Sequence, residues 1–150
     1  MRGMLNRWIA ALATTAACGL VVATAVARSR AAEVTIAAQP PLTATIAGET
    51  LAYPNTPEPV VSSSVVTMPP GSVTQWMTHP VPAYLYVLEG TLTVELVDGT
   101  RRTFDAGQSF LQCRTTWHRG RNEGTTPMRF LAVFVGAKGV PEILHPPGVD

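Results

Sequence analysis

Two side chains that could bind a metal ion lie two positions apart in the segment formed by residues 71–90. They are Met77 and His79, and they belong to a strand-like run that leads into two prolines. Side chains two positions apart on a regular strand point to the same face, so this pair could line one cavity. Imidazole is a ligand for zinc, copper, iron and nickel, whereas a thioether suits a soft ion such as Cu(I). Methionine more commonly fills a pocket as an adaptable apolar side chain.

The elements that position these side chains are expected to be short strands. From residue 60 onward, runs of β-branched and aromatic residues alternate with turn residues, as in an all-β sandwich or barrel. The runs cover residues 60–68, 72–79, 84–90, 91–99, 101–107, 108–113, 115–122 and 128–136. Gly90, Gly99 and Gly107 stand where tight reversals need a positive φ. No segment beyond residue 31 has helical periodicity, so we expect an all-β fold, a small antiparallel barrel.

The spacing of two blocks in this region resembles the two motifs of the cupin family. The first motif, G(X)5HXH(X)3,4E(X)6G, is in register with Gly71, Met77, His79, Ala83 and Gly90. The latter half of the second motif, G(X)5PXG(X)2H(X)3N, fits residues 113–122, and Gly107 begins that block. The sequence is similar to small single-domain cupins related to quercetin-dioxygenase-like proteins. This resemblance implies a cupin-type antiparallel jelly-roll β-barrel.

The resemblance also implies a metal site with two of its four usual ligands replaced. The family usually binds its metal through three histidines and one glutamate, and the matching positions here are Met77, His79, Ala83 and His118. His79 and His118 are therefore the candidate metal ligands. Two imidazoles alone bind divalent ions weakly, and a missing carboxylate removes the charge that would balance the cation. The alternative is that both histidines are neutral and hydrogen-bonded inside the barrel.

The segment around His118 departs from the second motif in two places. Cys113 and Thr115 occupy its proline and loop-glycine positions, which implies a locally altered turn before the histidine. Asn122 matches the asparagine of the motif and is expected to tie down the following loop. Three nearby arginines could bind an anionic ligand or be solvated loop charges: Arg114, Arg119 and Arg121.

Neighbours of Met77 could also shape the cavity. On a regular strand Gln75 shares its face and could offer an amide to a ligand, whereas Trp76 points away and packs on the sheet. If the protein binds a divalent transition metal, an atypical third ligand is needed beside the two histidines. Gln75 and Gln112 are the candidates for that role.

The first 31 residues have the features of an export signal. Arg2 and Arg7 precede an uncharged run over residues 8–27, and Ala25 and Ala27 are small residues at the positions that a signal peptidase reads. We expect a signal peptide at 1–27, with a second candidate cleavage after residue 31. An uncleaved membrane anchor and a lipoprotein modified at Cys18 are the alternatives. Each of these readings predicts a secreted or periplasmic domain.

Length and composition favour one domain after this leader. The chain has 150 residues and a formal net charge of +1, and its charge pattern does not indicate a nucleic-acid surface. Residues 28–59 are expected to form an N-terminal extension with short edge strands and a proline-rich connector. Residues 60–150 are expected to form the cupin domain. Contact with a membrane is expected only through an uncleaved or lipidated N-terminus.

Two functional hypotheses follow from these observations. The first is an exported single-domain cupin whose barrel pocket binds a small molecule, with metal-dependent chemistry reduced or lost. The alternative is a metal-dependent dioxygenase or isomerase-like cupin that uses His79 and His118 with an atypical third ligand. Whether the protein is an enzyme stays open at this point. Because exposed sheet edges tend to pair, a homodimer is a further expectation.

Overall fold

A computed structural model describes residues 33–147 of the chain, and within this range all regular structure is β-strand. The strands are β1 (Pro59–Met68), β2 (Ala83–Glu89), β3 (Thr91–Leu96), β4 (Arg101–Asp105), β5 (Ser109–Leu111), β6 (His118–Arg121) and β7 (Met128–Ala137). In the described part of the chain, no helix has the length and apolar character needed to cross a membrane. The expected signal peptide at 1–27, with its alternative cleavage at 31, lies outside the described residues.

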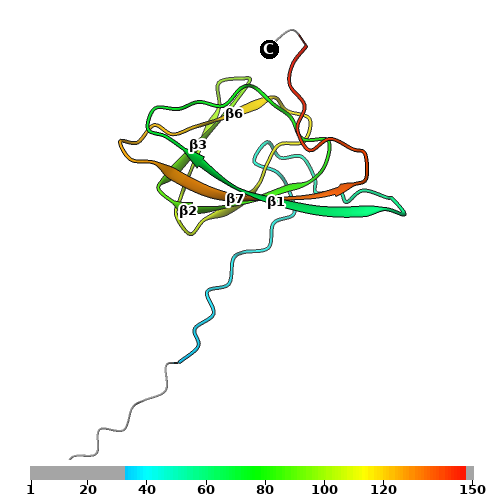
Figure 1. Ribbon diagram of the computed structural model, residues 1–150, viewed down its shortest axis with the longest axis horizontal. Coiled ribbons are helices and arrows are strands. Elements are labelled where there is room, and N and C mark those ends of the chain that lie inside the picture. The colour runs from blue at the N-terminus through cyan, green and yellow to red at the C-terminus, as the bar shows by residue number, and fades with distance from the viewer. Residues whose placement is uncertain (1–32, 148–150) are drawn as a thin grey trace, which may run out of the picture. The chain divides into compact units, whose positions relative to one another are not determined.

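The strands form two antiparallel sheets that enclose the core. One sheet has the order β1-β7-β2-β5 and the other has the order β4-β3-β6 (Figure 1). Alternate side chains of the long strands point inward, as Leu85 on β2 and Phe130 on β7 do, and both are buried. Their outward neighbours are more exposed. The expected cupin-type antiparallel jelly-roll β-barrel is confirmed.

Glycine allows the tight reversal between β2 and β3. Gly90 has φ = +74°, in the left-handed region, and a Cβ at this position would lie 2.8 Å from Cβ of Met128. Both the backbone conformation and the close approach of β7 therefore favour glycine here. The positive φ predicted at Gly99 and Gly107 is also confirmed.

The strand expected at residues 72–79 is wrong as a continuous element. This segment forms only isolated bridges, from Val73 to Arg121, from Met77 to His118 and from Thr78 to Leu144. Prolines at 69, 70, 80 and 82 flank it and cannot donate ladder hydrogen bonds, which limits regular pairing. The segment leaves β6 after Met77 and pairs with the C-terminal segment instead.

The described part of the N-terminal extension contains a short turn rather than full edge strands. Within residues 33–59, the bridge between Ala44 and Thr50 closes this turn. The amide of Ile46 donates to the carbonyl of Leu111 at 3.0 Å and ties the turn to β5. The compact unit Ala37–Asp150 includes this turn together with the barrel. The boundary predicted at residues 59 and 60 stays a prediction.

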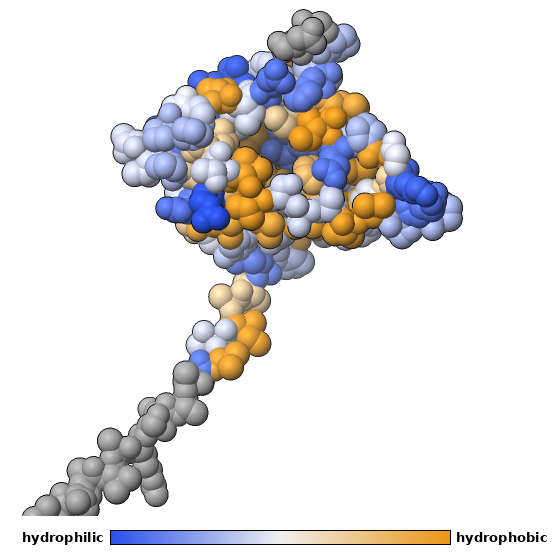
Figure 2. Space-filling view, viewed as in Figure 1, coloured by the Kyte–Doolittle hydropathy of each residue, from blue (hydrophilic) through white to orange (hydrophobic). Residues whose placement is uncertain are grey.

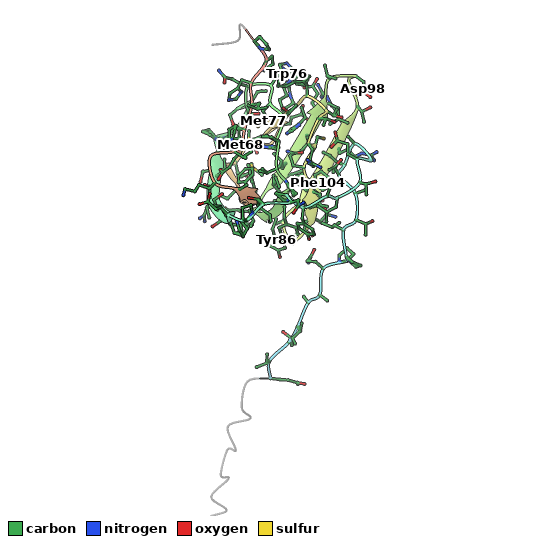
Figure 3. All side chains as sticks on the ribbon, turned by 90° about the vertical axis from the view of Figure 1, so that its right-hand side faces the viewer. Met68, Trp76, Met77, Tyr86, Asp98 and Phe104 are labelled. Atoms are coloured by element: carbon green, nitrogen blue, oxygen red, sulfur yellow. The ribbon has the colours of Figure 1, made fainter. Side chains whose placement is uncertain are left out.

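The C-terminal segment turns back from β7 and lies along residues 76–79. Thr78 and Leu144 exchange two backbone hydrogen bonds of 2.9 Å, and His145 Nδ1 lies 3.0 Å from the carbonyl oxygen of Trp76. The segment is red in Figure 1. In Figure 3, Trp76 and Met77 lie toward one end of the barrel and Tyr86 toward the other. The C-terminal segment therefore covers the end of the barrel that contains the candidate residues.

Candidate functional site

A cavity of about 280 Å³ lies between the two sheets. Its wall is mostly aliphatic and aromatic, with a few polar side chains. The residues that line the cavity include Ser64, Thr74, Met77, His79, Gln112, Phe134, Glu142 and Ile143. Figure 2 shows this face of the molecule hollowed near its centre, with hydrophobic residues gathered around the hollow. The cavity can therefore hold a small, largely apolar molecule.

The two candidate histidines face each other at this cavity. His79 lines the cavity, and His118 is fully buried at the start of β6. Their Nε2 atoms are 3.3 Å apart, and their ring centroids are 5.1 Å apart. The ring of His79 also contacts that of Phe134, at a centroid distance of 5.4 Å. The fold thus brings together residues that lie 39 positions apart in the sequence.

Backbone carbonyls fix the tautomer of both imidazoles. Nδ1 of His79 lies 2.7 Å from the carbonyl oxygen of Glu142, and Nδ1 of His118 lies 2.9 Å from that of Thr116. A carbonyl oxygen can only accept a hydrogen bond, so each Nδ1 must be the donor. A neutral imidazole has one N–H, and both Nε2 atoms are therefore bare. Two lone pairs face each other, and a shared proton or a cation between the rings would satisfy them.

Burial keeps both rings neutral at pH 7. Desolvation lowers the pKa of His79, and it outweighs the raising effects of the Glu142 carbonyl and carboxylate. Desolvation also lowers the pKa of His118 to about 4, with a further lowering from the charge of His79. The hydrogen bond to Thr116 and the charge of Glu49 act in the opposite direction.

Met77 and Ala83 occupy the other two positions that the motif singles out. Met77 exchanges backbone hydrogen bonds of 2.8 Å and 3.0 Å with His118, so their side chains start from the same face of this short pair. The thioether lines the cavity, which is the pocket-filling role considered for it above. Ala83 is 1% exposed and belongs to the hydrophobic core.

The two glutamines considered as a third metal ligand lie in different environments. Gln75 is exposed and does not line the cavity, because its segment is not a regular strand. Gln112 is buried and lines the cavity, and its side-chain oxygen accepts a hydrogen bond from the amide of Cys113 at 3.3 Å. That contact occupies the side-chain oxygen of Gln112 and leaves its NH₂ group as the donor. An NH₂ group donates hydrogen bonds and does not coordinate a metal ion.

Two of the three arginines near His118 are paired, whereas the Arg114 guanidinium donates to the carbonyl of Pro80 at 3.4 Å. Arg119 and Arg121 each donate to the Glu95 carboxylate at 2.8 Å, on the outer face of the three-stranded sheet. The Arg119 guanidinium also lies 4.5 Å from the ring centroid of Trp76. Hydrogen bonds from Arg119, together with its charge, outweigh desolvation and lower the pKa of Glu95 to about 2. Because Arg119 and Arg121 are bonded to Glu95, they are neither a free site for an anionic ligand nor fully solvated loop charges.

Two carboxylates near the site were not predicted from the sequence. Glu142 lines the cavity, its carboxylate bonds to Ser62, and its carbonyl holds His79. Glu49, from the N-terminal turn, accepts hydrogen bonds from the loop that precedes His118. Neither residue belongs to a motif, so no signal in the sequence connected them to the histidines. Asn122 behaves as expected, since its amide donates to the carbonyls of Met68 and Thr126 and so ties down the loop.

The residues present fit part of a metal site. Zinc–nitrogen bonds of 2.0–2.1 Å in a tetrahedral site place two imidazole nitrogens roughly 3.3 Å apart, and the two Nε2 atoms are 3.3 Å apart. Among residues 33–147, however, no three or more His, Cys, Asp or Glu side chains are grouped to hold a metal ion. His79 and His118 could therefore fill two coordination positions. A structural or catalytic zinc site normally has at least three protein ligands.

The sequence and the fold both resemble known cupins. The family model described as Cupin domain matches residues 64–134. None of the curated proteins is similar to the chain. A solved structure with a double-stranded beta-helix domain, an uncharacterized conserved protein from Klebsiella pneumoniae subsp. pneumoniae MGH 78578, has a TM-score of 0.50 and 18% identity over 62% of this chain and 90% of that chain.

Two further solved structures are similar at lower scores. A cupin domain from Bordetella pertussis Tohama I has a TM-score of 0.46 and 23% identity over 51% of this chain and 82% of that chain. The formate complex of Lactobacillus farciminis oxalate decarboxylase has a TM-score of 0.49 and 22% identity over 57% of this chain. The present chain spans only 26% of the length of that decarboxylase. Residues 64–134 are therefore similar to a cupin domain, and the fold is similar to that of the double-stranded beta-helix protein.

Proposed function

We propose that this cupin domain binds a small, largely apolar molecule between its sheets, and that metal-dependent chemistry is reduced or lost. The observation that supports the proposal best is the cavity of about 280 Å³ with its mostly apolar wall. Binding sites for small molecules are commonly apolar cavities that contain a few oriented polar groups. This cavity has both properties, and the fold holds it open between two packed sheets.

The polar groups in the wall favour a ligand with a hydrogen-bond acceptor. Gln112 lines the cavity and has an NH₂ donor, and the hydroxyl of Ser64 is a further donor, whereas the hydroxyl of Thr74 already donates to the carbonyl of Gln75 at 3.0 Å. The carboxylate of Glu142 also lines the cavity and disfavours an anionic ligand by repulsion. A neutral molecule with a carbonyl or ether oxygen therefore matches the wall better than a carboxylic acid does.

Two probes of equal size test this proposal. Acetophenone has a carbonyl acceptor and ethylbenzene does not, so we expect acetophenone to bind roughly three- to tenfold more tightly, the value of one hydrogen bond. Methyl signals of Met77 and Leu85 in ¹³C NMR titrations would report both affinities. In Gln112→Leu the difference between the two affinities should become smaller. Unchanged methyl signals with both probes at millimolar concentration would refute a small-molecule site in this cavity.

A second candidate function rests on the opposed Nε2 atoms. Two bare nitrogens 3.3 Å apart are a favourable position for a cation, and imidazole binds divalent transition metals. His79 and His118 would hold such an ion, and the ion would supply Lewis-acid chemistry when bound. Water or substrate would have to complete its coordination. The alternative of a dioxygenase or isomerase-like cupin therefore depends on whether two imidazoles are enough.

Metal analysis separates the two candidate functions. The purified protein is incubated with zinc, iron(II), manganese or Cu(I), dialysed, and analysed for bound metal. We expect less than stoichiometric metal after dialysis, because two imidazoles bind weakly. One equivalent that survives dialysis and is lost in His79→Ala/His118→Ala would instead favour the metal-dependent enzyme.

Export and self-association are part of the same proposal. The signal-like leader supports a secreted or periplasmic location, and the exposed edge of β1 supports pairing of two copies. Mass analysis of the protein from a secreting host would identify its first residue. Sedimentation analysis would give its oligomeric state.

A further inference from the structure

Glu49 lies outside the cavity and accepts six hydrogen bonds. Its Oε1 accepts from the amides of Thr115 and Thr116, both at 2.9 Å, and from their hydroxyls at 2.6 Å and 3.0 Å. Its Oε2 accepts from the amide of Arg114 at 2.6 Å and from the hydroxyl of Thr45 at 3.0 Å. Three consecutive amides thus converge on one carboxylate, which fixes the conformation of residues 114–116.

The carbonyl groups of the same loop hold both histidines. The amide of His79 donates to the carbonyl of Arg114 at 3.2 Å, and Nδ1 of His118 donates to the carbonyl of Thr116 at 2.9 Å. A peptide unit is planar, so the Thr115 amide that Glu49 holds also restricts the carbonyl of Arg114. Glu49 holds Thr116 through both its amide and its hydroxyl, which fixes the residue whose carbonyl accepts from His118. Residues 114–116 therefore connect the carboxylate of Glu49 to the backbone of His79 and to the imidazole of His118.

Glu49 accepts most of the hydrogen bonds that this loop donates, and the carbonyl of Trp117 accepts one from the amide of Val97 at 2.9 Å. Residues 113–117 contain neither proline nor glycine and lie between β5 and β6 without regular pairing. The turn that carries Glu49 is itself held in place. The amide of Thr45 donates to the carbonyl of Glu49 at 2.8 Å, and that of Ile46 donates to Leu111 at 3.0 Å. The N-terminal turn thus supplies a fixed acceptor to a loop without regular strand pairing.

We propose that Glu49 is a positioning residue that fixes the Nδ1–H tautomer of His118 through the carbonyl of Thr116. While this carbonyl is in place, Nε2 of His118 stays bare and faces the bare Nε2 of His79. If the carbonyl moves, His118 gains by moving its proton to Nε2, because Nε2–H can then donate to His79. The proposal rests on the proposed function only in so far as His79, the partner of His118, lines the cavity.

The tautomer of His118 tests this inference without any ligand. Long-range ¹H–¹⁵N correlation spectra of the ¹⁵N-labelled full chain distinguish a protonated ring nitrogen from a bare one. In the unmodified protein, we expect Nδ1 of both histidines to be protonated. In Glu49→Gln the side-chain NH₂ must replace one acceptor oxygen, so a donor faces a donor. We expect most His118 rings to change to the Nε2–H tautomer in this variant.

Two further variants keep the test decisive. Thr115→Val removes the hydrogen bond of 2.6 Å to Glu49 but leaves the carboxylate, and it should give a smaller shift in the same direction. Thr115→Val alone decides the test if Glu49→Gln does not fold. Glu95→Gln is the matched control, because Glu95 is also multiply hydrogen-bonded but makes no contact with residues 114–116. Its His118 tautomer should be unchanged.

An unchanged tautomer of His118 in a folded variant would overturn the inference. Suppose that Glu49→Gln or Thr115→Val is folded, as judged by its methyl spectrum, and that Nδ1 of His118 remains protonated as in the unmodified protein. Glu49 would then stabilise the loop without positioning the histidine. Failure of the acetophenone titration would leave this result untouched, so the two proposals can fail separately.

Discussion

Single side chains decide how reactive the centre of this barrel can be. His79 and His118 both donate from Nδ1 to backbone carbonyls, and both are depleted of charge by burial. Such a pair favours a bound cation but offers no carboxylate to balance it. Ala83, at the position that the motif reserves for glutamate, contributes a methyl group to the core instead. The polarity of the cavity is therefore set mainly by Gln112 and Glu142.

Restoring two ligands should create a metal site. Met77 pairs directly with His118, and Ala83 pairs with Phe134, whose ring contacts His79. We expect Met77→His/Ala83→Glu to bind zinc, with a melting temperature that rises on addition of zinc. Without metal this variant should be less stable than the unmodified protein, because the carboxylate introduced at position 83 is buried without a counter-charge.

The two single variants are the controls for that experiment. Neither has three imidazoles together with a carboxylate, so each should show a smaller rise in melting temperature with zinc. If the double variant is folded and its melting temperature does not respond to zinc, positions 77 and 83 do not face the histidine pair in the way that the motif register requires.

At the scale of elements, turns and terminal segments position the site more than the regular strands do. The N-terminal turn at residues 44–50 holds the loop before β6, and the C-terminal segment holds His79 and part of the cavity wall. The strands supply the frame on which these segments pack. The reversal between β2 and β3 illustrates how closely that frame is packed, since Gly90 lies directly against β7.

Substituting that glycine should cost more than substituting another turn glycine. Both Gly90 and Gly99 have positive φ, but only a Cβ at residue 90 would meet a neighbour, Met128, at 2.8 Å. We expect Gly99→Ala to cost about 1–2 kcal/mol of unfolding free energy from backbone strain, and Gly90→Ala to cost about 1–3 kcal/mol more from overpacking. Urea denaturation measures both. Equal losses would contradict the close approach of β7.

For the molecule as a whole, buried titratable groups make stability depend on pH. The pKa of His118 is lowered to about 4 in the folded state, so the unfolded chain takes up this proton first as the pH falls. The stability that neutral His118 contributes is fully present above pH 6.5, the ordinary pKa of histidine, and is lost as the pH falls toward 4. The pKa of His79 is lowered as well and acts in the same direction.

Glu49 adds a second stage at lower pH. Desolvation would raise its pKa, but hydrogen bonds from Thr115 and Arg114 outweigh burial and lower the pKa to about 2. Stability from this carboxylate is present above its ordinary pKa of 4.5 and is lost as the pH falls toward 2. Each stage is expected to be on the order of 2 kcal/mol after allowance for solvent screening.

Urea denaturation between pH 3 and pH 8, with a chelator present, would resolve the two stages. His118→Phe should flatten the decline between pH 6.5 and 4, and Glu49→Gln should reduce the decline below pH 4.5. A stability that is constant from pH 8 to pH 4 would show that the histidines are not buried as neutral groups.

The sequence by itself determined the fold class, most strand positions, the turn glycines and the pair His79 and His118. These features depend on local periodicity and on motif spacing, which are properties of the chain order. The expected strand at 72–79 was wrong, because its pairing partner changes from β6 to the C-terminal segment after Met77. Whether the pair binds a metal ion stays a prediction.

Only the tertiary structure decided which groups surround the pair. Glu49 and Thr116 are 67 positions apart in the chain, and Glu142 follows His79 by 63 positions, yet Glu49 holds the loop before His118 and the carbonyl of Glu142 accepts from His79. Such contacts arise when two sheets close and terminal segments fold over them. No local pattern encodes them, because a carboxylate or a carbonyl acquires its role from the donors that the topology brings to it.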